Sequence, residues 1–210
     1  MREVRIAIVG TSGMAGVYCN LALMSKRCRI VSVHSRSIER GTKFAKDHRV
    51  PRFSNQFDHA FLVDVDAVLV CTEPARHVDV VLELMKWNKH ILIEKPLDIS
   101  VEKAKVLINT EKNYKKIISV VSQYRFDPAL RTMKKEYSRL SPKSPTTVSL
   151  ILQKHRDKRY YENGSGWRSK EGSVFLNQGI HWLDIMNWFF GTPLECTSKA
   201  YITRSFLECA

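Results

Sequence analysis

Residues 4–16 read Val4-Arg5-Ile6-Ala7-Ile8-Val9-Gly10-Thr11-Ser12-Gly13-Met14-Ala15-Gly16. The β-branched run predicts a strand, and the apolar stretch that follows over 17–24 is long enough for a helix. Glycines between them permit positive φ and let a backbone approach a pyrophosphate, while the helix N-terminus supplies free N–H groups. This order is typical of a phosphate-binding βα unit. The spacing G-x-x-G-x-x-G matches the strict dinucleotide form only if Ser12 replaces the second glycine, so a purely structural tight turn is the alternative.

Strands and helices alternate along the next hundred residues. Strands are predicted over 29–33, 66–71, 90–93 and 117–121, and helices over 38–48, 75–87 and 101–110. Continuous apolar strands separated by helices favour a parallel sheet covered on both faces. We therefore predict an α/β protein whose residues 1–125 form a doubly wound, NAD(P)-binding Rossmann domain.

A charged pair follows one of these apolar strands. Residues 90–96 read His90-Ile91-Leu92-Ile93-Glu94-Lys95-Pro96. Ligands of an open α/β sheet bind beyond the carboxyl ends of its strands, so Lys95 would face a bound molecule. Pro96 restricts Lys95 to extended backbone and is expected to start the next helix. The alternative is an ordinary solvated surface lysine.

The end of the second strand decides between NAD and NADP. An acid there would bind the ribose 2′-hydroxyl, whereas a basic residue would tolerate a 2′-phosphate. The segment is His34-Ser35-Arg36-Ser37, without an acid. Arg36 could hold the phosphate and Ser35 could donate a hydrogen bond, which favours NADP. Alternatively, Arg36 and Ser37 only begin the next helix, with Ser37 as its N-cap.

Four motifs together resemble a known family. They are Gly10 to Gly16, Cys71-Thr72-Glu73-Pro74-x-x-His77, Lys89-His90-x-x-x-Glu94-Lys95-Pro96 and Arg125-x-x-Pro128. In order and spacing they are similar to the glucose-fructose oxidoreductase / inositol dehydrogenase / MocA family of NAD(P)-dependent oxidoreductases. The resemblance implies that Lys95 lies beside the nicotinamide and takes part in catalysis. The cofactor-binding candidates are Gly10, Thr11, Ser12, Gly13, Met14, Ser35, Arg36, Thr72, Pro74, His77, Glu94, Lys95 and Gln123.

The family also carries a D-x-G-x-H motif on a helix of its second domain, where the histidine acts on the substrate hydroxyl or carbonyl. This chain has Asn177-Gln178-Gly179-Ile180-His181, so the resemblance makes His181 catalytic and puts Asn177 in place of the aspartate. Helical spacing would align Asn177 and His181 on one face, with Asp184 a turn further on, where its acid could fix a tautomer.

Hydride transfer between a sugar carbinol carbon and nicotinamide needs a proton carrier with a pKa near neutrality. A histidine ordinarily titrates near there, so we assign His181 as general acid/base and Lys95 as the group that polarises the oxygen; the reverse is the alternative. Asn177, together with the segment 165–170, is similar to the nucleotide-sugar branch, whose members oxidise the 3-hydroxyl of a UDP-linked N-acetylated hexuronic acid.

Residues 126–210 are expected to form a truncated α+β domain for substrate binding and oligomerisation. Strands are predicted over 146–154 and 196–204, a helix over 174–190, and an exposed loop over 141–145. Most of the sheet that the family carries here would be missing, which implies a fragment, a truncated product or a homo-oligomer that covers exposed strand edges. The alternative to a dehydrogenase is a dinucleotide-binding protein or subunit that has lost turnover.

Composition excludes few function classes. With 44% hydrophobic residues, no long apolar run and no signal peptide, the chain is expected to be soluble and cytoplasmic, without a membrane partner. The cysteines are widely spaced and odd in number, so free thiols are expected rather than disulfides or a metal site. They are Cys19, Cys28, Cys71, Cys196 and Cys209. The net charge of +13 is spread along the chain, which favours anionic small ligands such as NADP over nucleic acid.

Overall fold

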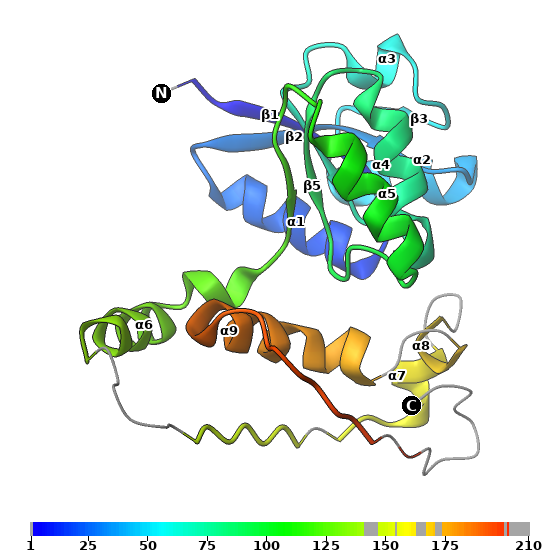
Figure 1. Ribbon diagram of the computed structural model, residues 1–210. Coiled ribbons are helices and arrows are strands. Elements are labelled where there is room, and N and C mark those ends of the chain that lie inside the picture. Colours follow the sequence, from blue (N-terminus) through cyan, green and yellow to red (C-terminus); the bar gives the residue numbers. More distant parts are fainter. Residues whose placement is uncertain are drawn as a thin grey trace. The chain divides into compact units, whose positions relative to one another are not determined.

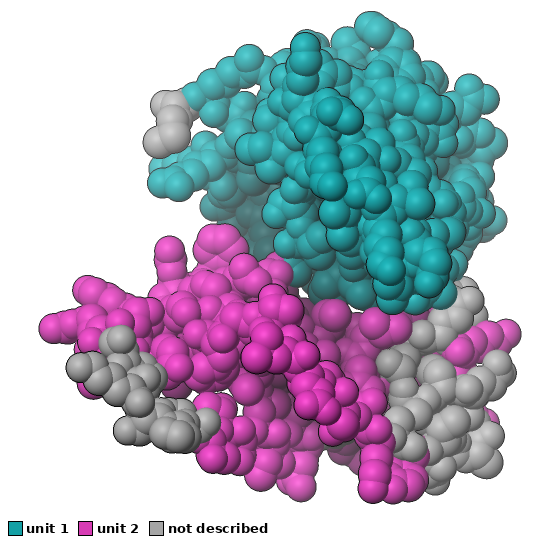
Figure 2. All heavy atoms as spheres, viewed as in Figure 1, with its two compact units in different colours: residues 1–121 teal, residues 122–210 magenta. Residues whose placement is uncertain are grey.

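The chain divides into two compact units, Met1–Val121 and Ser122–Ala210, which are coloured separately in Figure 2. The computed structural model describes residues 2–140, 147–153, 155–162, 167–170, 174–199 and 201.

A parallel β-sheet forms the centre of the first unit (Figure 1). Its strands are β1 (Val4–Val9), β2 (Cys28–His34), β3 (Arg52–Ser54), β4 (Ala67–Val70), β5 (His90–Ile93) and β6 (Ile118–Val120). They lie in the order β3-β2-β1-β4-β5-β6, and every neighbouring pair is parallel. This order reverses direction between β1 and β4, as in dinucleotide-binding folds. The predicted doubly wound Rossmann sheet is confirmed.

Alternate residues of the central strands pack into two separate cores. Ala7 and Val9 of β1 lie in a core with α3 (His59–Leu62), α4 (His77–Met85) and α5 (Val101–Glu111). Ile8 points to the other face, into a core with α1 (Gly13–Met24) and α2 (Ile38–Asp47). All three side chains are at most 1% exposed. Because strand side chains alternate between faces, a continuously apolar strand is what a sheet covered on both sides requires.

Four helices of this unit begin at polar N-caps whose side-chain oxygens accept hydrogen bonds from backbone N–H groups, whereas α4 has no side-chain cap. Ser12 caps α1, Ser37 caps α2, Asp58 caps α3 and Ser100 caps α5. The expectation that Pro96 starts a helix is wrong, because α5 begins at Val101 and the Lys95–Pro96 peptide, which is cis, belongs to the preceding loop. A short 3₁₀ turn, η1 (Pro74–Arg76), precedes α4.

The edge strand β3 and the short helix α3 were not predicted. Strand β3 has three residues, too few to show an alternating pattern, and it pairs only with β2. Its ladder begins at Ser32 opposite Arg52 and ends at His34 opposite Ser54. The edge of the sheet is thus set by long-range pairing and not by local sequence.

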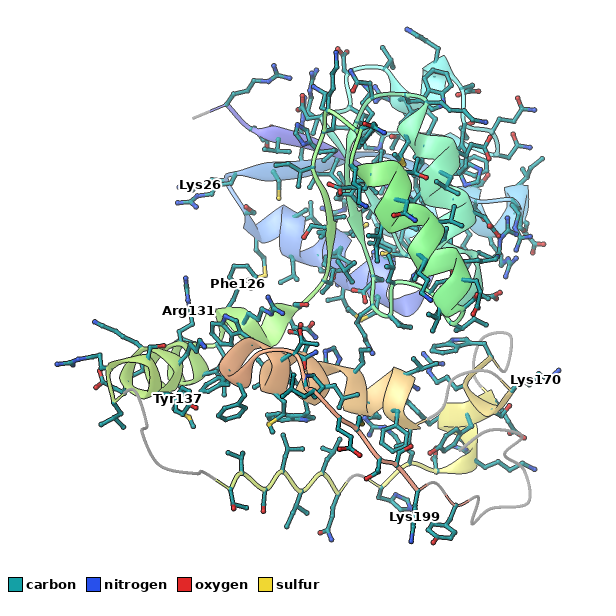
Figure 3. The ribbon with its side chains drawn as sticks, viewed as in Figure 1. Lys26, Phe126, Arg131, Tyr137, Lys170 and Lys199 are labelled. Atoms are coloured by element: carbon teal, nitrogen blue, oxygen red, sulfur yellow. The ribbon has the colours of Figure 1, made fainter. Side chains whose placement is uncertain are left out.

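Helices and turns are the regular elements among the described residues of the second unit. It contains the 3₁₀ turn η2 (Gln123–Phe126), α6 (Pro128–Leu140), α7 (Lys158–Glu162), α8 (Trp167–Lys170), the π-turn η3 (Phe175–Gly179) and α9 (Ile180–Phe190). Helix α6 packs on the end of α9, where the Tyr137 ring lies 5.2 Å from that of Phe190 and Lys134 Nζ donates to the Phe189 carbonyl at 3.0 Å. The Arg131 guanidinium lies 5.9 Å from the Phe126 ring centre; Figure 3 labels both residues.

Two strands expected in this unit are absent from its described part. Residues 147–153, 195–199 and 201 form no strand, while residues 146, 154, 200 and 202–204 lie outside the described residues, as does the loop predicted over 141–145. A strand exists only through hydrogen bonds to a neighbour, and the described residues of this unit offer none. The helix predicted over 174–190 is present, but η3 interrupts it with a wider turn.

None of the helices among the described residues combines the length and apolar content that crossing a membrane requires.

Candidate functional site

The turn after β1 fits a close backbone approach. Gly10 has φ of +104°, and a Cβ at this position would lie 2.6 Å from the Cys71 carbonyl oxygen. Its N–H donates to the His34 carbonyl at 2.9 Å, so the turn lies where β1 meets both β2 and β4. A glycine is required here because any side chain would collide with the end of β4.

The N-terminus of α1 is open. Ser12 and Gly13 are exposed, and a Cβ on Gly13 would meet nothing within 4 Å. Ser12 Oγ accepts from Ala15 N at 3.3 Å. The N–H groups of a helix's first turn have no partner within the helix, so they are the groups that an anion at this end would meet. Gly16 makes room for the His48 ring, because a Cβ at this position would lie 3.0 Å from that ring.

The segment after β2 is neutral or basic. His34 and Ser35 are buried, whereas Arg36 is exposed. Burial lowers the pKa of His34, whose ring stacks on Phe57 with centres 4.2 Å apart. Ser37 is the N-cap of α2, which was the alternative reading of this segment. Arg36 is nevertheless exposed, so it is available to an anionic ligand bound where the carboxyl ends of the strands meet.

The end of β4 carries a buried hydroxyl that the protein leaves unsatisfied. Among the described residues, Thr72 Oγ1 is one of the few buried side-chain polar atoms without a hydrogen-bond partner. Such atoms are rare in folded proteins, and their usual explanation is a partner that the protein itself does not supply. Thr72 directly follows Cys71, whose carbonyl Gly10 approaches, so the hydroxyl and the glycine turn belong to one site.

The end of β5 presents Glu94 and Lys95. Glu94 is buried; its Oε1 accepts from Tyr18 Oη at 2.5 Å and its Oε2 from Lys95 N at 3.1 Å. Burial, together with the hydrogen bond to Glu94 and its charge, raises the pKa of Tyr18, which therefore stays a protonated donor. Lys95 is half-buried at the carboxyl edge of the sheet.

Cys71 is not a nucleophile in this setting. Burial, followed by the charge of Glu94, raises the pKa of its thiol, so the sulfur stays protonated at neutral pH. The four described cysteines are free thiols, while Cys209 lies outside the described residues. Among the described residues, no cluster of His, Cys, Asp or Glu is arranged to hold a metal ion.

Three predicted site residues belong to the second unit. Gln123 begins η2 and is exposed, Asn177 lies in the π-turn η3 and is buried, and His181 follows on α9. The His181 ring lies 5.0 Å from that of Tyr124. Both carboxylate oxygens of Asp184, the acid expected to fix a histidine tautomer, accept hydrogen bonds from Arg125, at 2.6 and 2.9 Å.

Tyr18 and Asp98 were missed by the sequence analysis. Tyr18 is a single phenol in the apolar helix α1, five residues after Gly13, and its partner Glu94 is 76 residues away. Asp98 is buried in the loop after β5, where its carboxylate accepts from Val78 N at 3.3 Å. The one available signal was an acid among apolar residues shortly after Glu94-Lys95-Pro96.

In the first unit, the carboxyl ends of β1, β2, β4 and β5 thus come together around a tight glycine turn and an open helix N-terminus. Open space at Gly13, the unsatisfied Thr72 hydroxyl and the exposed Arg36 fit a dinucleotide lying across the point where the strand order reverses. The fold and the site define a dinucleotide-binding domain.

Residues 4–122 match the model of the Gfo/Idh/MocA family, an oxidoreductase family with an NAD-binding Rossmann fold. The chain belongs to this family.

Relatives are similar over most of this chain. Inositol 2-dehydrogenase of Rubrobacter xylanophilus is 28% identical over 197 residues, which cover 92% of this chain and 54% of that protein. The scyllo-inositol 2-dehydrogenase (NADP(+)) IolU of Bacillus subtilis is 26% identical over 210 residues, covering 98% of this chain and 64% of the relative. The chain thus spans between about half and two thirds of the length of these relatives.

The fold is also that of solved dehydrogenases. The structure of the WlbA dehydrogenase from Bordetella pertussis in complex with NADH and UDP-GlcNAcA matches with a TM-score of 0.81 at 22% identity, over 90% of this chain and 59% of that one. This likeness establishes the fold of the chain.

Proposed function

We propose that this chain is an NAD(P)-dependent dehydrogenase that acts on a secondary hydroxyl of a sugar, inositol or nucleotide sugar. The observation that carries the proposal is the position of Lys95, half-buried at the end of β5 on the sheet edge that also carries the glycine turn. A lysine there is placed to meet a reacting oxygen beside a dinucleotide. The names of the relatives, two inositol dehydrogenases and a dehydrogenase bound to UDP-GlcNAcA, support the substrate class.

The reaction removes a hydride from the carbinol carbon and a proton from its oxygen, which leaves a carbonyl. A bound nicotinamide supplies the hydride acceptor. Lys95 polarises and orients the oxygen, and His181 takes its proton as general base, returning it in the reverse direction. Asn177 orients the substrate or the imidazole. Gly10, Thr11, Ser12, Gly13 and Met14 hold the pyrophosphate, and Thr72, Pro74, Glu94 and Gln123 complete the cofactor site.

A substrate panel tests this function. Purified protein is mixed with NAD or NADP and with myo-inositol, scyllo-inositol, free hexoses or UDP-linked sugars, and nicotinamide absorbance is followed. We expect reduction with at least one ring polyol, and oxidation of added NADH or NADPH by the matching ketone. Tight dinucleotide binding without reduction of either cofactor by any substrate would instead support a binding protein or subunit.

NADP is proposed as the preferred cofactor because Arg36 is exposed at the end of β2 and no acid accompanies it. Relatives offer both precedents, since the name of IolU contains NADP(+) and the WlbA structure holds NADH. Replacing Arg36 with alanine should weaken NADP about tenfold or more and change NAD affinity little, because one charge-assisted contact to a phosphate is lost.

Calorimetric titration of both cofactors measures this effect. Arg29→Ala is a matched control, since Arg29 is an exposed arginine at the opposite end of β2, paired with Glu3 at 3.2 Å. Equal losses for NAD and NADP in Arg36→Ala would refute a phosphate contact by Arg36.

A further inference from the structure

His77 was expected to bind the cofactor, but its ring is committed elsewhere. It is the first residue of α4 and only 1% exposed. Nδ1 lies 2.8 Å from the Pro96 carbonyl oxygen, and Nε2 lies 3.0 Å from the Thr72 carbonyl oxygen. Carbonyl oxygens only accept, so a ring with one N–H donates to one of the two carbonyls at a time, and a ring with two N–H groups donates to both. The imidazole therefore lies between two strand-end segments, with each ring nitrogen facing a main-chain carbonyl.

The two carbonyls flank the candidate site. Thr72 follows β4 and carries the unsatisfied buried hydroxyl, whereas Pro96 directly follows Lys95. On its other side, Lys95 is preceded by Glu94, whose N–H donates to Val70 at 2.9 Å. The main chain around Lys95 is thus held to β4 by a sheet bond before it and to His77 by a side-chain contact after it.

Asp98 provides a second anchor from the same loop to α4. Its Oδ2 accepts from Val78 N at 3.3 Å, and its Oδ1 accepts from Ile99 N at 2.8 Å and Ser100 N at 3.0 Å. The loop after β5 is therefore fixed at two points to the first turn of one helix. The two anchors, at Pro96 and Asp98, are two residues apart and together define the position and the direction of the segment that leaves Lys95.

We propose that His77 is a positioning residue. Its contact with the Pro96 carbonyl fixes the position of Lys95, and its contact with the Thr72 carbonyl fixes the segment that carries the Thr72 hydroxyl. The proposal rests on the proposed function of Lys95. Catalysis depends steeply on geometry, so a displacement of about 1 Å in a reacting group can reduce turnover roughly a hundredfold. Loss of the Pro96 contact should therefore reduce turnover, whereas loss of the Thr72 contact should weaken cofactor binding.

Two conservative variants each retain one of the two His77 contacts and remove the other. In His77→Asn the amide nitrogen lies near the position of Nδ1 and retains the bond to Pro96, and in His77→Gln it reaches the position of Nε2 and retains the bond to Thr72. We expect His77→Asn to keep kcat within about threefold and raise the dissociation constant for the cofactor about tenfold. His77→Gln should do the opposite, lowering kcat about tenfold with cofactor affinity nearly unchanged, since one hydrogen bond corresponds to about a tenfold effect.

Amide hydrogen exchange provides a readout that needs no turnover. His77→Gln should speed exchange in residues 97–100, and His77→Asn in residues 72–76, while thermal unfolding reports whether each variant is folded. Equal effects of both variants on kcat, affinity and exchange would overturn the proposal and leave His77 as a core residue. If the wild-type protein reduces no cofactor with any substrate, the proposed function fails, yet the exchange pattern still decides whether His77 holds these two segments.

Discussion

Replacing Lys95 with methionine should lower turnover roughly a hundredfold or more while leaving cofactor affinity nearly unchanged. Methionine keeps much of the apolar length of a half-buried lysine but removes the ammonium that would polarise the substrate oxygen. The backbone bond from Lys95 N to Glu94, at 3.1 Å, does not depend on the side chain and should persist. Steady-state kinetics and calorimetric cofactor titration measure the two quantities separately.

Lys86→Met is the matched control, because Lys86 is an exposed lysine at the end of α4, away from the carboxyl edge of the sheet. It should keep wild-type kinetics. If Lys95→Met turned over at the wild-type rate, Lys95 would have no part in the reaction and the proposed function would lose its main support.

Replacing Gly10 with alanine should lower the free energy of unfolding by about 2–5 kcal/mol. A φ of +104° is costly for a residue with a side chain, and the added Cβ would lie 2.6 Å from the Cys71 carbonyl oxygen, so β1 and β4 would have to separate. The dinucleotide site should be lost together with stability. Urea unfolding followed by circular dichroism, alone and with NADP, measures both effects.

Gly13→Ala separates the two roles of the glycine turn. Its Cβ would meet nothing within 4 Å, and Gly13 begins α1, where alanine favours the helix. Stability should therefore stay within about 1 kcal/mol of the wild type, while the methyl group intrudes where a pyrophosphate would lie and weakens NADP about tenfold or more. Unchanged NADP affinity in a folded Gly13→Ala protein would argue against a phosphate site at this turn.

Most of the first unit could be predicted from sequence because each central strand is an apolar run and each such run is followed by turn residues. The prediction failed where structure depends on distant partners. Strand β3 has only three residues and exists through its pairing with β2, and α5 begins at Val101 because Ser100 caps it, not at Pro96. In the second unit, residues 147–153 have a strand-like sequence but no strand to pair with among the described residues.

The sequence motifs predicted the candidate site, but they did not predict the side chains that hold its residues in place. Gly10 and Lys95 stand in recognisable local patterns, and the structure puts them on one sheet edge. The role of each supporting side chain depends on contacts across the sequence: Tyr18 reaches Glu94 over 76 residues, and His77 reaches Pro96 over 19. Sequence spacing does not indicate such long-range pairs. His77 was therefore predicted to bind the cofactor, whereas in the structure its ring lies between the Pro96 and Thr72 carbonyls.

The alternating burial of β1 makes the length of this strand intolerant of change. One residue added between Ile6 and Ala7 would turn Ala7 and Val9 toward α1 and α2 and move Ile8 to the opposite core, because side chains in a strand change face with every residue. The same insertion would shift Gly10 away from the Cys71 carbonyl that only a glycine can approach. A surface loop can tolerate such an insertion. In β1 it would disrupt the packing of both cores and the turn at Gly10 together.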